Sequence, residues 1–252
     1  GRVAFTGGIN LADEYINEIK RFGHWKDNAV MITGEAVRSF TIMFLQIWNI
    51  QNTDKEDYEK YLTEISVVNE DAYVMPYGDQ PFDKENVGEY VYMDIINKAK
   101  KYVYITTPYL IPDNEMLTCL EQASKRGVDI KIMMPHITDK PSAYLIARTY
   151  YPKLIERGIE IYEYTPGFVH AKTFISDDKK AVVGTVNMDF RSLYLNLECG
   201  AYMENVAAVK DIYADYMNTL EKCTQITLKD CNDYNPVLKL FGKLLWIIAP
   251  LM

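Results

Sequence analysis

The pattern of apolar and polar positions along the chain predicts strands that alternate with helices. Short apolar runs such as 128–134 and 159–164 have the length of buried strands, and the segment between them repeats its apolar residues at helical spacing. The same criteria predict strands at 3–6, 102–107, 128–134, 159–164 and 195–203, a β-hairpin at 170–185, and helices at 11–20, 34–49, 53–64, 89–100, 113–126, 141–156 and 204–222.

This alternation predicts an α/β protein in which helices cover both faces of a β-sheet. The sheet is expected to be mixed, because the hairpin adds antiparallel strands to it. The segment 76–88 is rich in Asp, Gly and Pro, which is typical of a linker. The linker would separate a small unit at 1–75 from a larger unit at 89–252.

Composition narrows the class of protein. The 252 residues are 48% hydrophobic, enough for a sizeable core in one or two domains. The formal net charge of −8 argues against nucleic acid as a partner, because nucleic-acid-binding proteins usually present a basic surface. The four cysteines have no paired spacing and are expected to be buried thiols, and no run of 18 apolar residues occurs.

Candidate chemistry is concentrated in one segment, which reads HAKTFISDDKKAVVGTVNMDFRS from His170 to Ser192. It begins with His170, Lys172 and Asp177 in the pattern H-x-K-x4-D, and it ends with the pattern GTxNxDxRS. His170 and Lys172 are two residues apart in a β-type run, so both side chains leave the same face of a strand. The hairpin would bring Asn187 back towards His170.

These residue types together indicate a site for a phosphodiester. An imidazole attacks phosphorus or protonates a leaving alkoxide. The ammonium of Lys172 and the polar groups of Thr185 and Asn187 can hold the non-bridging oxygens as charge develops on them. Such a site needs no metal or cofactor, and the usual metal-ligand spacings are absent from the sequence. A single histidine in a strand more often has a structural role. The prediction therefore depends on the joint occurrence of the histidine, the lysine, the aspartate, the Gly-Thr turn and the asparagine in one segment.

The motif resembles the hallmark of the phospholipase D superfamily, and other phrases are similar to the bacterial cardiolipin synthases. These phrases are FTGGINLADEYIN at 5–17, TPYLIPD at 107–113, KIMMP at 131–135 and GFVHAK at 167–172. The resemblance covers nearly the whole chain. It implies two copies of the motif, which together build one active site between two similar lobes.

The sequence departs from that family pattern in its first half. The chain has three histidines, and of the other two only His24 begins an H-x-K pattern, without the Asp or the glycine-rich turn that should follow. The segment AFTGGIN at 4–10 aligns with AVVGTVN at 181–187, so only the tail of a first motif is present. We therefore expect 1–75 to be a remnant of the first lobe, the first His-Lys-Asp set to lie before Gly1, and 89–252 to be the second, catalytic lobe.

The internal repeat and the resemblance assign further residues. Asn10 should take the phosphate-binding place in the first lobe that Asn187 takes in the second. The resemblance makes Glu198 the carboxylate that orients a catalytic histidine. Asp27 is its possible first-lobe counterpart, although a structural role is the favoured reading for that residue. Asp177 is expected to order its loop and Lys172 rather than to touch phosphorus.

The resemblance implies a phosphatidyltransferase that joins two phosphatidylglycerol molecules into cardiolipin and releases glycerol through a phosphohistidine intermediate. It favours the first-lobe histidine as nucleophile and His170 as general acid, and the reverse assignment stays open. With one histidine, the chain alone is expected to be inactive. The alternatives are a phospholipase D-type phosphodiesterase or nuclease, and a non-catalytic half-site that binds phospholipid. A homodimer that pairs two copies of His170 is also conceivable.

The same resemblance places the protein at the bacterial cell membrane, with the catalytic region on the cytoplasmic side. Family members usually carry membrane-spanning helices in the part that would precede Gly1. The run 238–248 is apolar with two lysines, and it is too short to span a bilayer. A helix that packs on the core is the first interpretation of this run, and contact with the membrane interface is the second.

Overall fold

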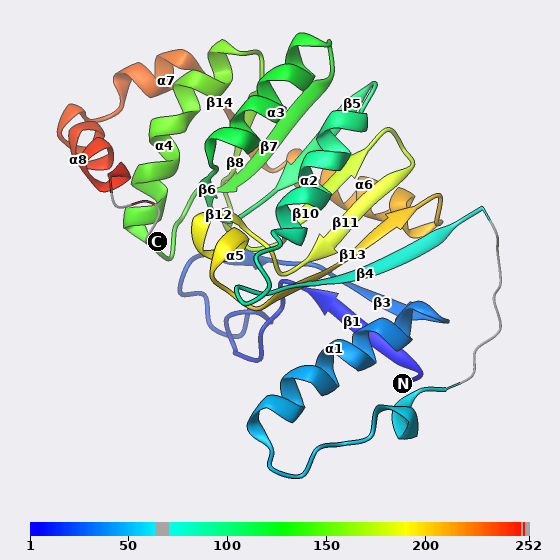
Figure 1. Cartoon of the computed structure of the whole chain (residues 1–252). Helices are drawn as coiled ribbons and strands as arrows, with labels where there is room; N and C mark the ends of the chain where they lie inside the picture. Colours follow the sequence, from blue (N-terminus) through cyan, green and yellow to red (C-terminus); the bar gives the residue numbers. More distant parts are fainter. Residues whose placement is uncertain (64–70, 248, 250–252) are drawn as a thin grey trace.

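A mixed β-sheet of eight strands forms the centre of the protein (Figure 1). The structure is a computed structural model and describes residues 1–63, 71–247 and 249. The strands lie in the order β14-β8-β7-β5-β10-β11-β13-β4. The neighbours β5, β7 and β8 run parallel, and the other pairs are antiparallel. The predicted fold class, an α/β protein with a mixed sheet between helices, is confirmed.

The longer predicted strands and helices are present, and the structure adds several short elements that the sequence did not predict. The strands are β1 Val3–Gly7, β2 His24–Lys26, β3 Ala29–Thr33, β4 Tyr73–Asp79, β5 Tyr102–Thr106, β6 Leu110–Ile111, β7 Asp129–Pro135, β8 Glu160–Tyr164, β9 Gly167–Val169, β10 Thr173–Ser176, β11 Lys180–Gly184, β12 Met188–Asp189, β13 Glu198–Glu204 and β14 Cys223–Ile226. The helices are α1 Ala36–Gln51, α2 Val87–Lys98, α3 Asn114–Lys125, α4 Pro141–Glu156, α5 Phe190–Tyr194, α6 Ala208–Leu220, α7 Leu228–Asp233 and α8 Pro236–Trp246, with a short 3-10 turn at Tyr58–Tyr61.

Alternate residues of the sheet pack into two separate cores because successive side chains of a strand point to opposite faces. In β5, for example, Val103 and Ile105 belong to the core under α2, α3 and α4. Their neighbours Tyr102 and Tyr104 belong to the core under α6. Figure 1 shows α2, α3 and α4 on the near side of the sheet and α6 behind it.

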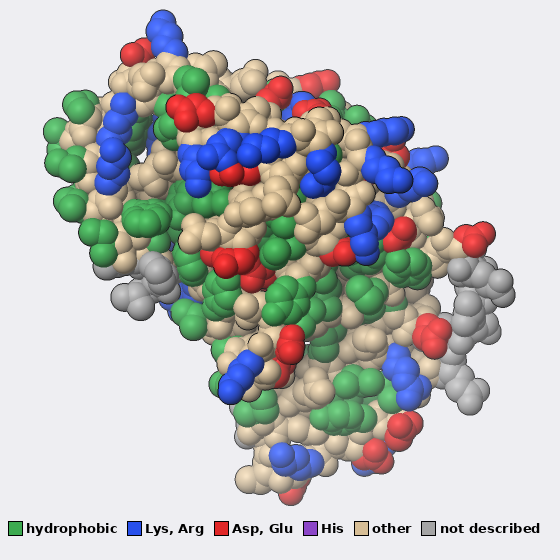
Figure 2. Space-filling model, turned by 45° about the horizontal axis from the view of Figure 1, so that its top comes forward, with side chains coloured by type: hydrophobic (Ala, Val, Ile, Leu, Met, Phe, Trp, Pro, Cys, Tyr) green, Lys and Arg blue, Asp and Glu red, His purple; other side chains and the backbone are tan. Residues whose placement is uncertain are grey.

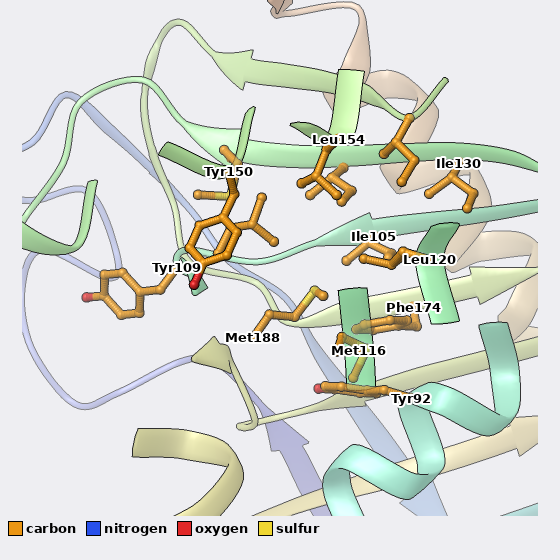
Figure 3. Packing of buried hydrophobic residues seen from close by; sticks show 14 of the residues in the cluster. Tyr92, Ile105, Tyr109, Met116, Leu120, Ile130, Tyr150, Leu154, Phe174 and Met188 are labelled. Atoms are coloured by element: carbon orange, nitrogen blue, oxygen red, sulfur yellow. The ribbon is translucent and has the colours of Figure 1, made fainter. Parts of the chain in front are cut away.

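An aromatic stack lies at the middle of the larger core. The rings of Tyr92 from α2 and Phe174 from β10 are nearly parallel with their centroids 3.9 Å apart. Both side chains are almost fully excluded from solvent. Figure 3 shows the stack beside Met116 and Ile105, with further aliphatic side chains beyond them. This packing fixes β10, the strand that follows Lys172 directly.

A small unit at the start of the chain packs against the edge of this sheet. Strands β1 and β3 form an antiparallel pair, and Ile32 of β3 packs with Val37 of α1 and Ala201 of β13. The unit therefore shares a core with the large sheet. None of the described helices combines the length and the hydropathy that crossing a membrane requires.

The predicted helix at 11–20 is wrong. These residues form turns and bends, and Leu11 and Ile16 are exposed. Asn17 has a left-handed backbone with a φ of 62°. Its side chain accepts a hydrogen bond from the amide of Trp25 and donates one to the carbonyl of the same residue. This pairing pins the segment as a loop, and helical spacing in the sequence does not reveal it.

Two other predicted boundaries differ from the structure. The expected linker at 76–88 begins inside β4, which pairs with β13 along its whole length. Pro76 is tolerated there because β4 is the edge strand and needs no hydrogen bond from that position to a further neighbour. The predicted helix at 53–64 is reduced to the turn Tyr58–Tyr61, and its last residue, Glu64, lies outside the described residues.

We predict that Phe174→Ala lowers the free energy of unfolding by about 3–5 kcal/mol, because it removes one ring of a buried stack and leaves a cavity. Urea denaturation followed by circular dichroism measures this change. Phe82→Ala is the matched control, since Phe82 is 75% exposed and its replacement should change stability by less than about 0.5 kcal/mol. Equal effects of the two substitutions would contradict the packing described for β10.

Candidate functional site

His170 lies where the small unit at the start of the chain, called the remnant below, meets the larger unit, called the large lobe below. It follows β9 directly, and β9 pairs in parallel with β2 of the remnant. The backbone amide of His170 donates a hydrogen bond of 2.7 Å to the carbonyl of Lys26. A strand from each part of the chain therefore fixes the backbone of this histidine.

A carboxylate from the remnant holds the imidazole. Nδ1 of His170 lies 2.9 Å from Oδ2 of Asp27, whose side chain is only 3% exposed. When Nδ1 donates this hydrogen bond, Nε2 of the neutral ring carries the lone pair and can accept a hydrogen bond. The sequence predicts Glu198 as the acid that orients a catalytic histidine, whereas the structure places Asp27 beside this ring. The sequence favoured a purely structural role for Asp27, and such a role does not account for its contact with the imidazole of His170.

Aromatic rings pack around the same imidazole. The ring of Tyr15 meets it edge-on at 5.4 Å between centroids, and the ring of Trp25 lies at 5.2 Å. Sequence reasoning missed both residues. Position in the chain was the only signal for either residue. Trp25, for example, precedes Lys26 in the segment that pairs with β9. Burial in this environment lowers the pKa of His170, and Lys172 adds to that effect while Asp27 opposes it.

Lys172 is a buried cation beside the histidine. Its side chain is almost fully buried, and Nζ lies 2.9 Å from Nε2 of His170 and donates to the carbonyl of the same residue. Burial lowers the pKa of Lys172 to about 8, against the opposing charges of Asp27 and Glu198. None of the ion pairs within 4.0 Å in the described part of the chain includes Lys172. The ammonium therefore remains available to an anion.

The glycine-rich turn of the large lobe holds a second polar cluster. The hydroxyl of Thr185 donates to Oε2 of Glu198, and Nδ2 of Asn196 donates to Oε1 at 3.1 Å. Nδ2 of Asn187 donates to the hydroxyl of Ser192 at 2.9 Å. Burial raises the pKa of Glu198, and Lys172 is among the charges that oppose the rise. The structure thus brings Thr185 and Asn187 into the neighbourhood of Lys172, and the buried Oδ1 of Asn187 has no hydrogen-bond partner among the residues that the structure describes.

The two lobes repeat the same strand register around their acidic residues. In the remnant Gly7 of β1 pairs with Ala29 of β3, and in the large lobe Gly184 of β11 pairs with Gly200 of β13. An acidic side chain occupies the position two residues before each partner. These acidic residues are Asp27 and Glu198.

The glycine-rich turn of the remnant touches the histidine site. A Cβ on Gly8 would lie 2.2 Å from Oδ1 of Asp27 and 2.8 Å from the carbonyl oxygen of His170, so a side chain cannot be accommodated there. Asn10 lies further out and is exposed, with Nδ2 donating to the hydroxyl of Tyr15 at 2.8 Å. The predicted phosphate-binding residue Asn10 therefore reaches the imidazole only through Tyr15.

The hydrogen bonds of Asp177 are made away from His170. Its carboxylate accepts hydrogen bonds from the backbone amides of Lys100, Lys101 and Tyr102, at 2.8 to 3.0 Å. It orders the turn of the hairpin against the start of β5, as the sequence predicts for its own loop. These contacts tie the far end of β10 to β5, and Lys172 lies before the opposite end of that strand.

The other two histidines have partners elsewhere. Nδ1 of His24 lies 3.0 Å from the hydroxyl of Tyr164, and Nδ1 of His136 lies 2.9 Å from the buried carboxylate of Glu163. Among the described residues no group of three or more His, Cys, Asp or Glu side chains is arranged to hold a metal ion. One imidazole, one ammonium and one carboxylate therefore form the reactive set, suited to proton transfer or nucleophilic attack at an anionic phosphorus centre.

A family model described as "Cardiolipin synthase, PLD-like domain" matches residues 92–221. A protein of Streptococcus mutans is 52% identical over 252 residues, which is 100% of this chain and 54% of that protein. The cardiolipin synthase of Alkalihalophilus pseudofirmus is 37% identical over 227 residues, 90% of this chain and 45% of the relative. The chain thus spans about half the length of the curated relatives it matches.

Solved structures agree with this relationship at the level of the fold. Phosphatidylserine synthase from Haemophilus influenzae superposes with a TM-score of 0.73 at 12% identity, covering 100% of this chain and 69% of that one. The phospholipase D family member Nuc from Salmonella typhimurium gives 0.53 at 18% identity, covering 62% of this chain and 98% of that one. The resemblance seen in the H-x-K segment is confirmed, and the chain belongs to the family of cardiolipin synthase, phospholipase D-like domains.

Proposed function

We propose that this chain supplies half of a phosphatidyltransferase site that makes cardiolipin and glycerol from two molecules of phosphatidylglycerol. The observation that carries the proposal is the buried Lys172 ammonium, which has no carboxylate within ion-pair distance and lies against Nε2 of His170. A buried cation without a counter-ion is costly, and an anionic phosphodiester would offset that cost. His170 would then face the bound phosphorus, with Asp27 fixing the orientation of its ring.

In the first step, a histidine of the other half-site attacks phosphorus and the bond from phosphorus to the glycerol headgroup oxygen breaks. His170 donates a proton from Nε2 to that oxygen, and glycerol leaves. In the second step, Nε2 takes the proton from a hydroxyl of a second phosphatidylglycerol, whose oxygen attacks phosphorus and breaks the bond to nitrogen. Both histidines are restored, and cardiolipin is the product.

Charge explains how His170 can serve as the acid. Burial lowers its pKa and so favours the neutral ring over the charged one. A phosphodiester anion bound beside the ring favours the charged form, and Asp27 accepts the Nδ1 proton of that form. Lys172 balances the negative charge that grows on the non-bridging oxygens during both steps.

The second histidine must come from a segment other than those described. Glu198 occupies the position equivalent to Asp27, but neither of the other two histidines is hydrogen-bonded to it. His24 contacts Tyr164, and His136 contacts Glu163. In the large lobe β11 lies between β10 and β13, whereas β1 pairs only with β3 among the described residues. We propose that a strand carrying a second H-x-K set pairs with the free edge of β1.

A groove supports this arrangement. It has a volume of about 1130 Å³ and is lined by residues of the remnant and of the large lobe, including Val3, Phe5, Trp48, Leu197 and Glu198. The apolar members of this set are exposed in the chain as described. A second half-site seated there would cover them and would bring a histidine towards Glu198. The occupant is either another part of a longer chain or a second copy of this one.

The lipid substrate places the proposed enzyme at the bacterial membrane, and we propose the cytoplasmic side for the catalytic region. A nuclease or another phospholipase D-type hydrolase would use the same residues. The net charge of −8 disfavours a polynucleotide as substrate. Product analysis distinguishes transfer from hydrolysis, since hydrolysis of phosphatidylglycerol gives phosphatidic acid and no cardiolipin.

In an enzyme that carries both half-sites, His170→Ala is expected to lower the rate of cardiolipin formation by about 10²-fold or more, because proton transfer to the leaving oxygen is lost. Lys172→Ala should have an effect of similar size, because the transition-state charge is no longer balanced. Cardiolipin is followed by mass spectrometry, with folding checked by circular dichroism. The exposed Lys179→Ala is the matched control and should keep the wild-type rate.

A residual rate above about a tenth of wild type would rule out these two roles. Samples quenched with acid test which histidine is the nucleophile and which is the general acid. A phosphatidyl adduct on the other histidine agrees with His170 as acid, and an adduct on His170 reverses the assignment.

The pKa of Lys172 predicts how phosphodiester binding depends on pH. The ammonium is the form that binds, and it is lost as the pH rises through about 8. The affinity of the chain for a soluble glycerophosphodiester should therefore fall about tenfold between pH 7 and pH 9. Titration calorimetry measures it. Lys172→Gln should bind weakly at every pH, and Lys179→Gln should follow the wild-type curve. An affinity that does not change up to pH 9 would contradict this role of Lys172.

The chain alone is expected to form no cardiolipin from phosphatidylglycerol vesicles, because separate nucleophile and acid cannot both be supplied by one imidazole. Mass spectrometry of lipid extracts provides the measurement. Turnover that rises more steeply than the protein concentration would show instead that two copies combine their His170 residues, and sedimentation velocity would then detect the dimer.

A further inference from the structure

Helix α8, Pro236–Trp246, presents three different faces. Residues 238, 242 and 245 follow one another at helical spacing on the face turned to the protein. Residues 239, 243 and 246 form a second face with two lysines and a tryptophan. The third face is apolar and consists of Val237, Leu240, Phe241, Leu244 and Ile247. An ordinary surface helix needs only one apolar face, so the second apolar face requires an explanation.

The first face, together with Trp246 of the second face, attaches α8 to α4. Gly242 is buried, and a Cβ there would lie 2.7 Å from the carbonyl oxygen of Leu145, so glycine allows the two helices to approach closely. Leu245 packs against the main core. Nε1 of Trp246 donates a hydrogen bond of 2.7 Å to the hydroxyl of Tyr150. The run 238–248 is therefore a packed helix, as first interpreted, and its last residue, Ile248, lies outside the described residues.

The third face lies open to solvent. Its five side chains are between 51% and 71% exposed. Figure 2 shows hydrophobic side chains gathered at the edge of the molecule where α8 lies in Figure 1, with basic side chains next to them. Single exposed apolar residues are common, but a contiguous stripe on a helix marks an interaction surface.

We propose that this apolar face of α8 docks the protein on an anionic phospholipid bilayer, with the helix lying in the plane of the membrane interface. Apolar residues on one side with lysine and tryptophan beside them are the composition of interfacial helices. Lys239 and Lys243 lie in a helix without any acidic residue, although the chain as a whole carries a net charge of −8. A basic helix on an acidic protein directs this surface, rather than another, towards anionic lipid.

The position of α8 suits a lipid-modifying enzyme. It packs on α4, whose first residue, Pro141, follows directly after Asp139 and Lys140. The carboxylate of Asp139 is close enough to raise the pKa values of both His170 and Lys172. Helix α4, against which α8 packs, therefore begins at the rim of the candidate site. Docking through α8 would hold that rim near the lipid headgroups, and to this extent the inference rests on the proposed function.

Vesicle binding of the chain tests the proposal. Sedimentation with vesicles that contain phosphatidylglycerol and phosphatidylcholine gives the partition coefficient, and pure phosphatidylcholine gives the neutral reference. The double variant Leu240→Glu, Leu244→Glu should bind the mixed vesicles at least about tenfold more weakly, because it removes apolar contact and adds repulsion. Lys239→Gln and Lys243→Gln should each weaken binding about fivefold on the anionic vesicles only.

The matched control is the double variant Phe82→Glu, Tyr90→Glu. It makes the same change of charge at two exposed aromatic residues away from α8, 75% and 51% exposed, and should bind like the wild type. Quenching of Trp246 fluorescence by brominated lipid gives an independent readout that Trp246→Phe removes. Circular dichroism confirms that each variant is folded.

Equal binding by the α8 variant and the control would overturn the proposal. So would an absence of wild-type binding together with a dimer that the Leu240→Glu, Leu244→Glu variant dissociates, since α8 would then be a contact between copies. Binding is measured without turnover. A complete wild-type enzyme that makes no cardiolipin would therefore count against the proposed function alone, whereas a wild-type chain that does not bind the mixed vesicles would count against the docking surface alone.

Discussion

The hydrogen bond between Asp27 and His170 is the interaction on which the candidate site depends. It joins two residues 143 positions apart, and it forms because β2 of the remnant pairs with β9 of the large lobe. That pairing buries the carboxylate and fixes the backbone of the histidine at the same time. Neither part of the chain orients the imidazole by itself, so the small remnant is an integral part of the site.

Burial of Lys172 follows from the same packing and sets the chemistry. Water is largely excluded around the ammonium, and the carboxylates nearest to it do not form an ion pair. In a medium of low polarity such a cation attracts an anion more strongly than an exposed lysine does. The affinity for phosphate that we propose thus arises from the position of one charge and not from a basic surface, which agrees with the acidic composition of the chain.

The strand register that the two lobes share relates Asp27 to Glu198. Equivalent strand registers place an acidic residue opposite each glycine-rich turn, and only Asp27 has a histidine beside it among the described residues. The groove next to Glu198 is also lined by β1, which pairs only with β3 in the described part of the chain, and this is where we propose that the equivalent set fits. The apolar face of α8 is on a different element, packed against α4, and therefore calls for a different partner.

The sequence by itself determined the mixed α/β fold, most of the longer helices and strands, and the candidate residues His170 and Lys172, because apolar periodicity and a compact motif are local properties. It misjudged 11–20 and 76–88, where Asn17 bonds to Trp25 and Pro76 sits in an edge strand. It named Glu198 as the acid that orients a catalytic histidine, and it gave less weight to Asp27, the possible first-lobe counterpart of Glu198. Only the tertiary structure decided that Asp27 is hydrogen-bonded to His170, because a hydrogen bond depends on which strands pair in space, and the pairing of β2 with β9 joins segments that are far apart in the chain.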